Sequence, residues 1–223
     1  MCIRDSGVDV PNSLLLSTKQ KKQITVKGIN GIKWNSSNSS VVSVSKNGTI
    51  YAKKTGNAVL MGTLGDLQLG CAVSVVTPAR KRTVQKAIQI AKTCTYSQPK
   101  RMQEKFYDCS SLVWKSYHKN GVNFGMAYYA PVAADMGKWC VQHKKLVSGG
   151  MSRANIQNMK LNPGDVMFET GQKNGRYKGI YHVEMITGYI FYGFDGNGKA
   201  ELGIQWATGD EKYYPIGQMV GRP

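Results

Sequence analysis

The chain has 223 residues, of which 41% are hydrophobic, and this composition excludes a wholly disordered protein. It carries 30 Lys and Arg against 13 Asp and Glu, a formal net charge of +17 that favours an anionic partner. The basic residues are scattered and carry no nucleic-acid-binding signature, which argues against nucleic acid as that partner. No apolar run reaches the length of a membrane span, so none is predicted.

The cysteine count is odd, and no two cysteines are close in the sequence. This pattern argues against a disulfide framework and against a structural zinc site, so the sequence predicts neither a metal nor a cofactor. Residues 1–6 (MCIRDS), which include Cys2, resemble a translated sequencing adapter. We expect them to be non-native and the true N-terminus to be missing, so a missing signal peptide says nothing about export.

Short alternating runs predict strands in the first third of the chain, at 23–26, 41–45, 49–52, 58–63 and 68–76. Asn47 and Gly48 separate two of them and tolerate the positive φ of a tight hairpin turn. Strands at this spacing favour a small β-sandwich, which we place at residues 7–78.

This part resembles the bacterial Ig-like domains of group 2 over residues 13–76. The resemblance rests on 33–38 (KWNSSN), 41–45 (VVSVS), 47–50 (NGTI) and 55–58 (TGNA). It implies a spacer or adhesive module, with Trp34 as a core residue and no chemistry in this half of the chain.

After Pro78 the pattern changes to helices followed by strands. Helices are predicted at 83–93, 109–120 and 131–143, and strands at 166–168, 180–190 and 202–207. This order is typical of the α+β class, with helices packed on an antiparallel sheet, and we assign it to a second domain at 79–223.

Cys109 stands at the start of the second predicted helix. Free amide groups and the helix dipole lower a thiol pKa there and can hold an oxyanion, so Cys109 is a candidate nucleophile. The alternative is a buried structural cysteine. If Cys109 is a nucleophile, it needs a base, and the candidates are the histidines of the chain. His118 lies about 13 Å along the same helix, too far to reach.

His143 neighbours Cys140 late in the third helix, where the dipole opposes a thiolate and the exposed face is basic, so we interpret that pair as non-catalytic. His182 begins a predicted strand and is the candidate base. Gln205, on the strand that follows the 195–198 turn (DGNG), is the candidate residue that orients the imidazole. Alternatively, Gln205 only faces solvent from its strand.

These residues carry a resemblance to the NlpC-type family of bacterial cell-wall peptidases, which are papain-like. The matching segments, in family order, are 107–113 (YDCSSLV), 161–168 (LNPGDVMF), 182–188 (HVEMITG) and 204–207 (IQWA), within a resemblance over about 82–210. The resemblance implies a Cys-His-Gln triad of Cys109, His182 and Gln205.

The same resemblance implies an oxyanion role for Tyr96 and substrate recognition by Asp108 and Ser110, either of which could instead only cap the helix. Ser111 replaces the family's usual glycine, and residues 97–99 (SQP) replace its Trp-Gly-Gly stretch. The family's third polar residue is more often His than Gln. These departures from the family pattern affect the expected shape of the substrate groove and the substrate preference.

The resemblance implies a secreted, wall-located peptidase, commonly cutting between γ-D-glutamate and the diamino acid of the peptidoglycan stem. Stem peptides and anionic wall polymers are the expected partners, and the chain is expected to be a monomer. Two alternatives remain: an amidase or acyl transferase with the same thiol chemistry, and a non-catalytic adhesive or wall-binding surface protein.

Overall fold

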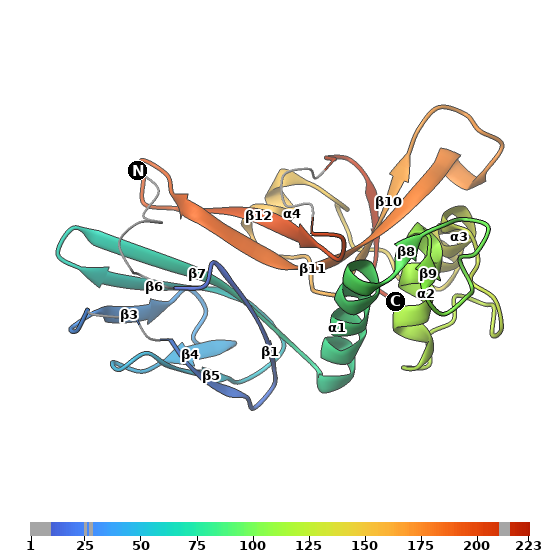
Figure 1. Cartoon of the computed structure of the whole chain (residues 1–223). Coiled ribbons are helices and arrows are strands. Elements are labelled where there is room, and N and C mark those ends of the chain that lie inside the picture. The colour runs from blue at the N-terminus through green and yellow to red at the C-terminus, as the bar shows by residue number, and fades with distance from the viewer. Residues whose placement is uncertain (1–9, 25, 27–28, 210–214) are drawn as a thin grey trace. The chain divides into compact units, whose positions relative to one another are not determined.

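The computed structural model describes residues 10–24, 26, 29–209 and 215–223. Predictions that fall on residues 1–6, including Cys2, lie outside these described residues. The chain divides into two compact units, Met1–Pro78 with Gly188–Gly203 and Ala79–Thr187 with Ile204–Pro223. Figure 1 shows both.

The first unit contains two sheets formed by the strands before Pro78. One has the order β1-β7-β6-β3 and the other β2-β5-β4. Buried side chains of both sheets, among them Ile50 and Val73, share one hydrophobic core, so the predicted sandwich is confirmed. The strands are β1 Ser13–Ser17, β2 Lys21–Gln23, β3 Lys33–Ser36, β4 Val42–Val44, β5 Thr49–Ala52, β6 Gly56–Leu64 and β7 Leu67–Val76.

The predicted turn at Asn47 and Gly48 joins β4 to β5. Gly48 has φ 81°, in the region that favours glycine, and its N–H donates to the Ser45 carbonyl at 2.9 Å. The turn fixes the antiparallel register in which Val44 faces Ile50. The hairpin prediction is therefore confirmed.

Two strands of the first unit were not predicted. β1 pairs in parallel with β7, and β3 carries Trp34, which packs partly buried against both core clusters of the unit. The strand predicted at 23–26 is instead β2, at Lys21–Gln23, while residue 25 lies outside the described residues.

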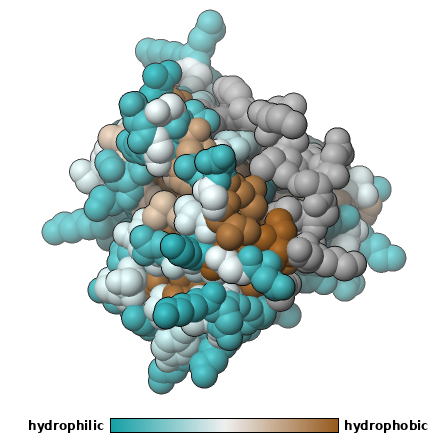
Figure 2. Space-filling view, turned by 90° about the vertical axis from the view of Figure 1, so that its left-hand side faces the viewer, coloured by the Kyte–Doolittle hydropathy of each residue, from teal (hydrophilic) through white to brown (hydrophobic). Residues whose placement is uncertain are grey.

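Figure 2 shows a face on which hydrophilic residues surround several smaller apolar patches. Among the described residues of β1–β7, only Tyr51 and Leu64 are exposed large hydrophobic residues. The sandwich thus keeps most of its apolar side chains inside.

Helices of the second unit follow the sequence pattern closely. The helix predicted at 83–93 begins five residues earlier, at Pro78, because proline suits a first helical turn. Its buried side chains, Thr83, Val84, Ala87 and Ile90, form one stripe. The helices are α1 Pro78–Thr93, α2 Cys109–His118, α3 Ala133–Gln142 and α4 Arg153–Gln157, with a short 3₁₀ turn η1 at Tyr177–Gly179.

The main sheet has the order β12-β11-β10-β13, and β10 is antiparallel to both β11 and β13. α3 approaches it at Gly137, where a Cβ would meet Ile180 and Met219. Helices packed on antiparallel strands are therefore confirmed. The papain-like fold of this part of the chain stays a prediction, and so does the domain boundary at residue 78. The strands are β8 Thr95–Tyr96, β9 Phe106–Tyr107, β10 Val166–Thr170, β11 Ile180–Phe194, β12 Ala200–Trp206 and β13 Met219–Gly221.

Candidate active site

Cys109 is the first residue of α2, and Asp108 caps that helix. Asp108 Oδ1 accepts a hydrogen bond from the Ser111 backbone N–H at 2.7 Å, and the Ser111 hydroxyl accepts one from the Asp108 backbone N–H at 2.8 Å. This capping box satisfies two backbone donors and fixes the start of the helix. The predicted helix-start position of Cys109 is confirmed.

The Cys109 thiol is half-buried. Burial raises its pKa above the ordinary value, with a further increase from the Asp108 charge. Hydrogen bonds from the backbone N–H groups of Val183 and Ser110, and the charge of Arg101, oppose this increase. The sequence predicted a lowered thiol pKa, and this was wrong because the helix dipole is visible in a sequence whereas desolvation depends on packing.

His182 lies on β11, next to the Val183 whose backbone N–H contacts the thiol. Burial lowers the pKa of His182, while the charges of Glu169 and Asp108 raise it. Asp108 therefore acts on both Cys109 and His182. The approach of the Val183 N–H to the thiol brings the start of α2 against the beginning of β11.

Gln205 lies further along the sheet. The Ala207 backbone N–H donates to the Met185 carbonyl at 3.0 Å. Ala207 therefore lies opposite Met185, three residues after His182 along β11. Gln205 comes two residues before Ala207 on the antiparallel strand β12, which places it still further from His182. The structure does not bring Gln205 beside the imidazole. Its assigned role stays a prediction without support from the register.

Tyr96 lies at the thiol end of the site because β8 pairs in parallel with β9, opposite Tyr107. Its ring meets that of Tyr107 edge-on at a centroid distance of 5.6 Å. The phenol oxygen accepts a hydrogen bond from the Cys109 backbone N–H, while burial raises the pKa of Tyr96. Tyr96 and Cys109 are therefore neighbours, as the oxyanion prediction requires.

Arg101 is a site residue that the sequence analysis missed. Its Nη1 lies 2.9 Å from Asp108 Oδ2 and donates to the Ser110 hydroxyl at 2.8 Å. Its Nη2 donates to the Ala130 carbonyl, and the guanidinium lies over the Tyr129 ring at 5.0 Å. Asp108 and Ser110 thus bond within the protein, while their predicted contact with substrate stays untested.

No sequence signal separates Arg101 from the other basic residues of its loop. Only its burial, at 8% exposure, distinguishes it.

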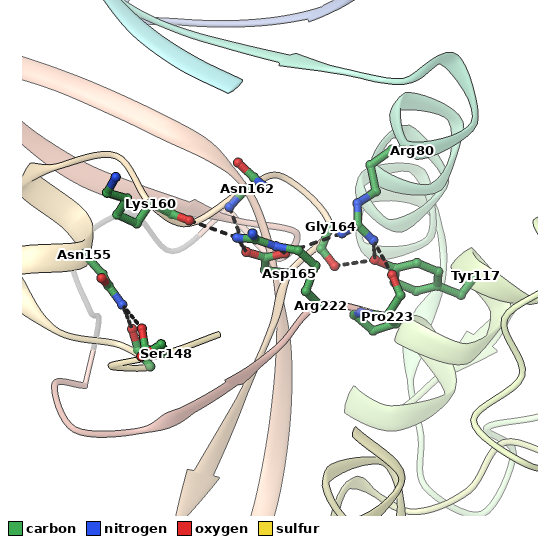
Figure 3. Close-up of polar contacts among 11 residues, drawn as sticks. Arg80, Tyr117, Ser148, Asn155, Lys160, Asn162, Gly164, Asp165, Arg222 and Pro223 are labelled. Atoms are coloured by element: carbon green, nitrogen blue, oxygen red, sulfur yellow. Dashed lines mark hydrogen bonds and ion pairs between the residues drawn. The ribbon is translucent and has the colours of Figure 1, made fainter. Parts of the chain in front are cut away.

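Asp165 fixes the start of β10. It is fully buried, and Arg222 binds it through two nitrogens, at 2.8 Å and 2.7 Å, with Arg80 at 3.4 Å (Figure 3). The Asn162 backbone N–H also donates to it at 2.8 Å. Arg80 in addition bonds the Tyr117 hydroxyl. Asp165, within the matching segment 161–168, is therefore held by ion pairs from Arg80 of α1 and from Arg222.

The other described histidines stack on tryptophan rings, and two of the other thiols are buried. Cys71 and Cys140 are buried, and burial raises the pKa of each to about 12. His118 stacks on Trp114 and His143 stacks on Trp139. The interpretation of the Cys140–His143 pair as non-catalytic stays a prediction. Across the described ranges, no group of three His, Cys, Asp or Glu side chains could hold a metal ion.

A sequence model of one family, the bacterial Ig-like domain of group 2, matches residues 10–75. Residues 10–75 are a bacterial Ig-like domain. The match covers strands β1 to β6 and nearly all of β7, and it agrees with the resemblance read from the turns and Trp34.

Two solved structures match part of this chain. One is a GH10 xylanase from termite gut that contains a bacterial Ig-like domain, with 22% identity over 29% of this chain and 18% of that chain and a TM-score of 0.27. The other is a mutant of the intimin of EHEC O157:H7, with 16% identity over 48% and 55% of the two chains and a TM-score of 0.25. This chain thus spans less than two thirds of either structure. None of the curated proteins matches it.

The Ig-like domain is compatible with an extracellular or surface protein. Within the described part of the chain, no helix combines the length and the apolar character needed to cross a membrane.

Proposed function

We propose that residues 79–223 are an NlpC-type, papain-like cysteine peptidase that cleaves peptidoglycan stem peptides. The observation that carries this proposal is that the Cys109 thiol, at the start of α2, faces the Val183 backbone N–H of β11, one residue from His182. A nucleophile at a helix start beside a strand-borne imidazole is the arrangement that thiol-dependent acyl transfer needs.

The protonation states favour general-base catalysis. Burial raises the pKa of Cys109 and lowers that of His182, so the resting pair at neutral pH is a thiol and a neutral imidazole. His182 takes the thiol proton as sulfur attacks the carbonyl carbon of the scissile amide. The tetrahedral intermediate collapses to a thioester when His182 gives that proton to the leaving amine. A water molecule, deprotonated by His182, then releases the acid and restores the thiol.

Tyr96 is the proposed oxyanion donor. Its hydroxyl oxygen accepts from the Cys109 backbone N–H, so the hydroxyl proton remains available to a substrate oxygen. A donor held beside the nucleophile stabilises charge that develops on the carbonyl oxygen. Asp108 and Ser110 stay proposed recognition residues, acting through the network that Arg101 organises.

The substrate class comes from the motif resemblance, which implies the bond between γ-D-glutamate and the diamino acid. The net charge of +17 supports attachment to anionic wall polymers, and such attachment should weaken as salt screens the charges. The Ig-like domain would serve as a spacer or anchor at the cell surface.

Digestion of purified peptidoglycan tests the proposal. Wild-type protein should release fragments with new stem-peptide termini, which mass spectrometry identifies, whereas Cys109→Ala should release none. Cys94→Ala is the matched control, because Cys94 is a second thiol of the same unit, bonded to the Glu104 carbonyl. Equal release by the Cys109→Ala protein would refute a peptidase centred on Cys109.

A second candidate function is adhesion or wall binding without catalysis, which the Ig-like domain favours. It predicts that wild type and Cys109→Ala bind intact walls equally and that neither releases stem peptides. An amidase or acyl transferase would instead give products without new stem-peptide termini.

A further inference from the structure

The strands β10 and β11 place a carboxylate directly opposite the candidate base. Their antiparallel register pairs Phe168 with Val183 and Glu169 with His182. Side chains of directly opposed residues point to the same face, with Cβ atoms about 5 Å apart. Glu169 and His182 therefore share one face of the sheet.

The face that carries Glu169 and His182 is partly accessible to solvent. Phe168 and Val183 are almost fully buried, at 0% and 1% exposure, so their side chains fill the core on the opposite face. Glu169 and His182 are each only partly buried. Among the described residues, Glu169 makes no ion pair with a basic side chain.

Both ends of β10 are fixed around Glu169. Asp165 and its arginine partners hold the start of the strand. At its end the register shifts between Glu169 and Thr170, and both the backbone N–H and the hydroxyl of Thr170 donate to the Gln218 side chain, at 2.8 Å and 3.0 Å. A register shift at this point changes the regular pairing directly after Glu169.

We propose that Glu169 is the positioning residue of His182. This rests on the proposed function, in which His182 is the base. In this role a side-chain rotation brings the Glu169 carboxylate to the N–H of one imidazole nitrogen, which directs the other nitrogen toward Cys109 and stabilises the imidazolium that forms during attack. It takes the place that the sequence analysis gave to Gln205.

The other ionisable groups around the imidazole are less suited to this role. Asp108, before α2, raises the pKa of His182 less than Glu169 does, and its oxygens bond Arg101 and Ser111. Glu184, two residues along β11, accepts a hydrogen bond from the Thr208 hydroxyl. The Cys109 thiol is the group to be deprotonated.

The test is an NMR titration of His182 in the full chain, with its signal assigned by comparison with a His182→Gln protein. Because the Glu169 charge raises the pKa of His182, Glu169→Gln should lower that pKa, and Glu169→Asp should restore it in part. Glu104→Gln, on an exposed loop, is the matched control and should leave it unchanged. An unchanged His182 pKa in Glu169→Gln would overturn the proposal.

Steady-state kinetics of the Glu169→Gln protein separate this inference from the proposed function. With active protein, Glu169→Gln should lower kcat about tenfold or more with KM little changed, and move the acid limb of kcat/KM to lower pH. If Cys109→Ala stays active, the peptidase proposal fails, whereas the titration still decides whether Glu169 acts on His182. An acid limb that does not move would count against Glu169.

Discussion

The Arg101 guanidinium lies 2.9 Å from the Asp108 carboxylate, and both side chains are buried directly beside the first residue of α2. The Asp108 charge raises the pKa of Cys109, and the Arg101 charge opposes this increase, while Asp108 still caps the helix. Hydrogen bonds to Arg101 and Ser111 outweigh burial and lower the pKa of Asp108 itself. The pair therefore connects helix stability with thiol chemistry.

Arg101→Met should destabilise the protein by about 3 kcal/mol or more, because it leaves the Asp108 carboxylate buried without its cation. It should also raise the pKa of the Cys109 thiol, since the Arg101 charge lowers it. Chemical denaturation measures the first effect, and the pH dependence of thiol alkylation measures the second. Arg82→Met, on the exposed side of α1, is the control. Wild-type values for both quantities in Arg101→Met would contradict this account.

The pH dependence of activity should follow His182. Burial lowers its pKa below the ordinary 6.5, so the imidazole is neutral at pH 7 and becomes protonated only as the pH falls below 6.5. Protonation removes the base, so kcat/KM should fall on the acid side of that value and stay level through neutral pH. A pH–rate profile on a soluble stem peptide measures this. An acid limb above pH 6.5 would show that another group controls the reaction.

The same lowered pKa makes stability depend on pH. The unfolded chain binds a proton on His182 more readily than the folded protein, so the free energy of unfolding should fall as the pH drops below 6.5. His182→Gln should reduce this dependence, which denaturation at several pH values would reveal. An identical slope in both proteins would speak against a buried neutral imidazole.

Asp165→Asn should destabilise the protein by about 3 kcal/mol, because Arg222 and Arg80 lose the buried carboxylate that they share. Asp135→Asn is the matched control, since Asp135 is exposed in the first turn of α3. Urea unfolding followed by circular dichroism compares the two. Equal midpoints for both variants would mean that the ion pairs add nothing to the start of β10.

Gly70→Ala should destabilise the first unit by about 1 to 3 kcal/mol, because the added methyl group would overlap the Phe191 ring. Gly193→Ala is the control, since nothing lies within 4 Å of its Cβ position. The double variant Gly70→Ala with Phe191→Ala should lose less stability than the sum of its single variants. Additive losses, measured by thermal unfolding, would exclude this contact as the cause.

Local patterns in the sequence determined much of this protein. The hairpin at Asn47 and Gly48, the helix that starts at Cys109 and the strand that carries His182 follow from turn chemistry, capping and periodicity. These features depend on hydrogen bonds and side chains within a few residues of one another, so a single sequence contains them.

Only the tertiary structure decided which side chains meet. Strand register placed Glu169 opposite His182 and moved Gln205 away, and packing buried Arg101 against Asp108. Desolvation, which depends on every neighbouring chain segment, reversed the expected shift of the Cys109 pKa. Register and burial arise from contacts between residues far apart in the chain, and no local pattern encodes them.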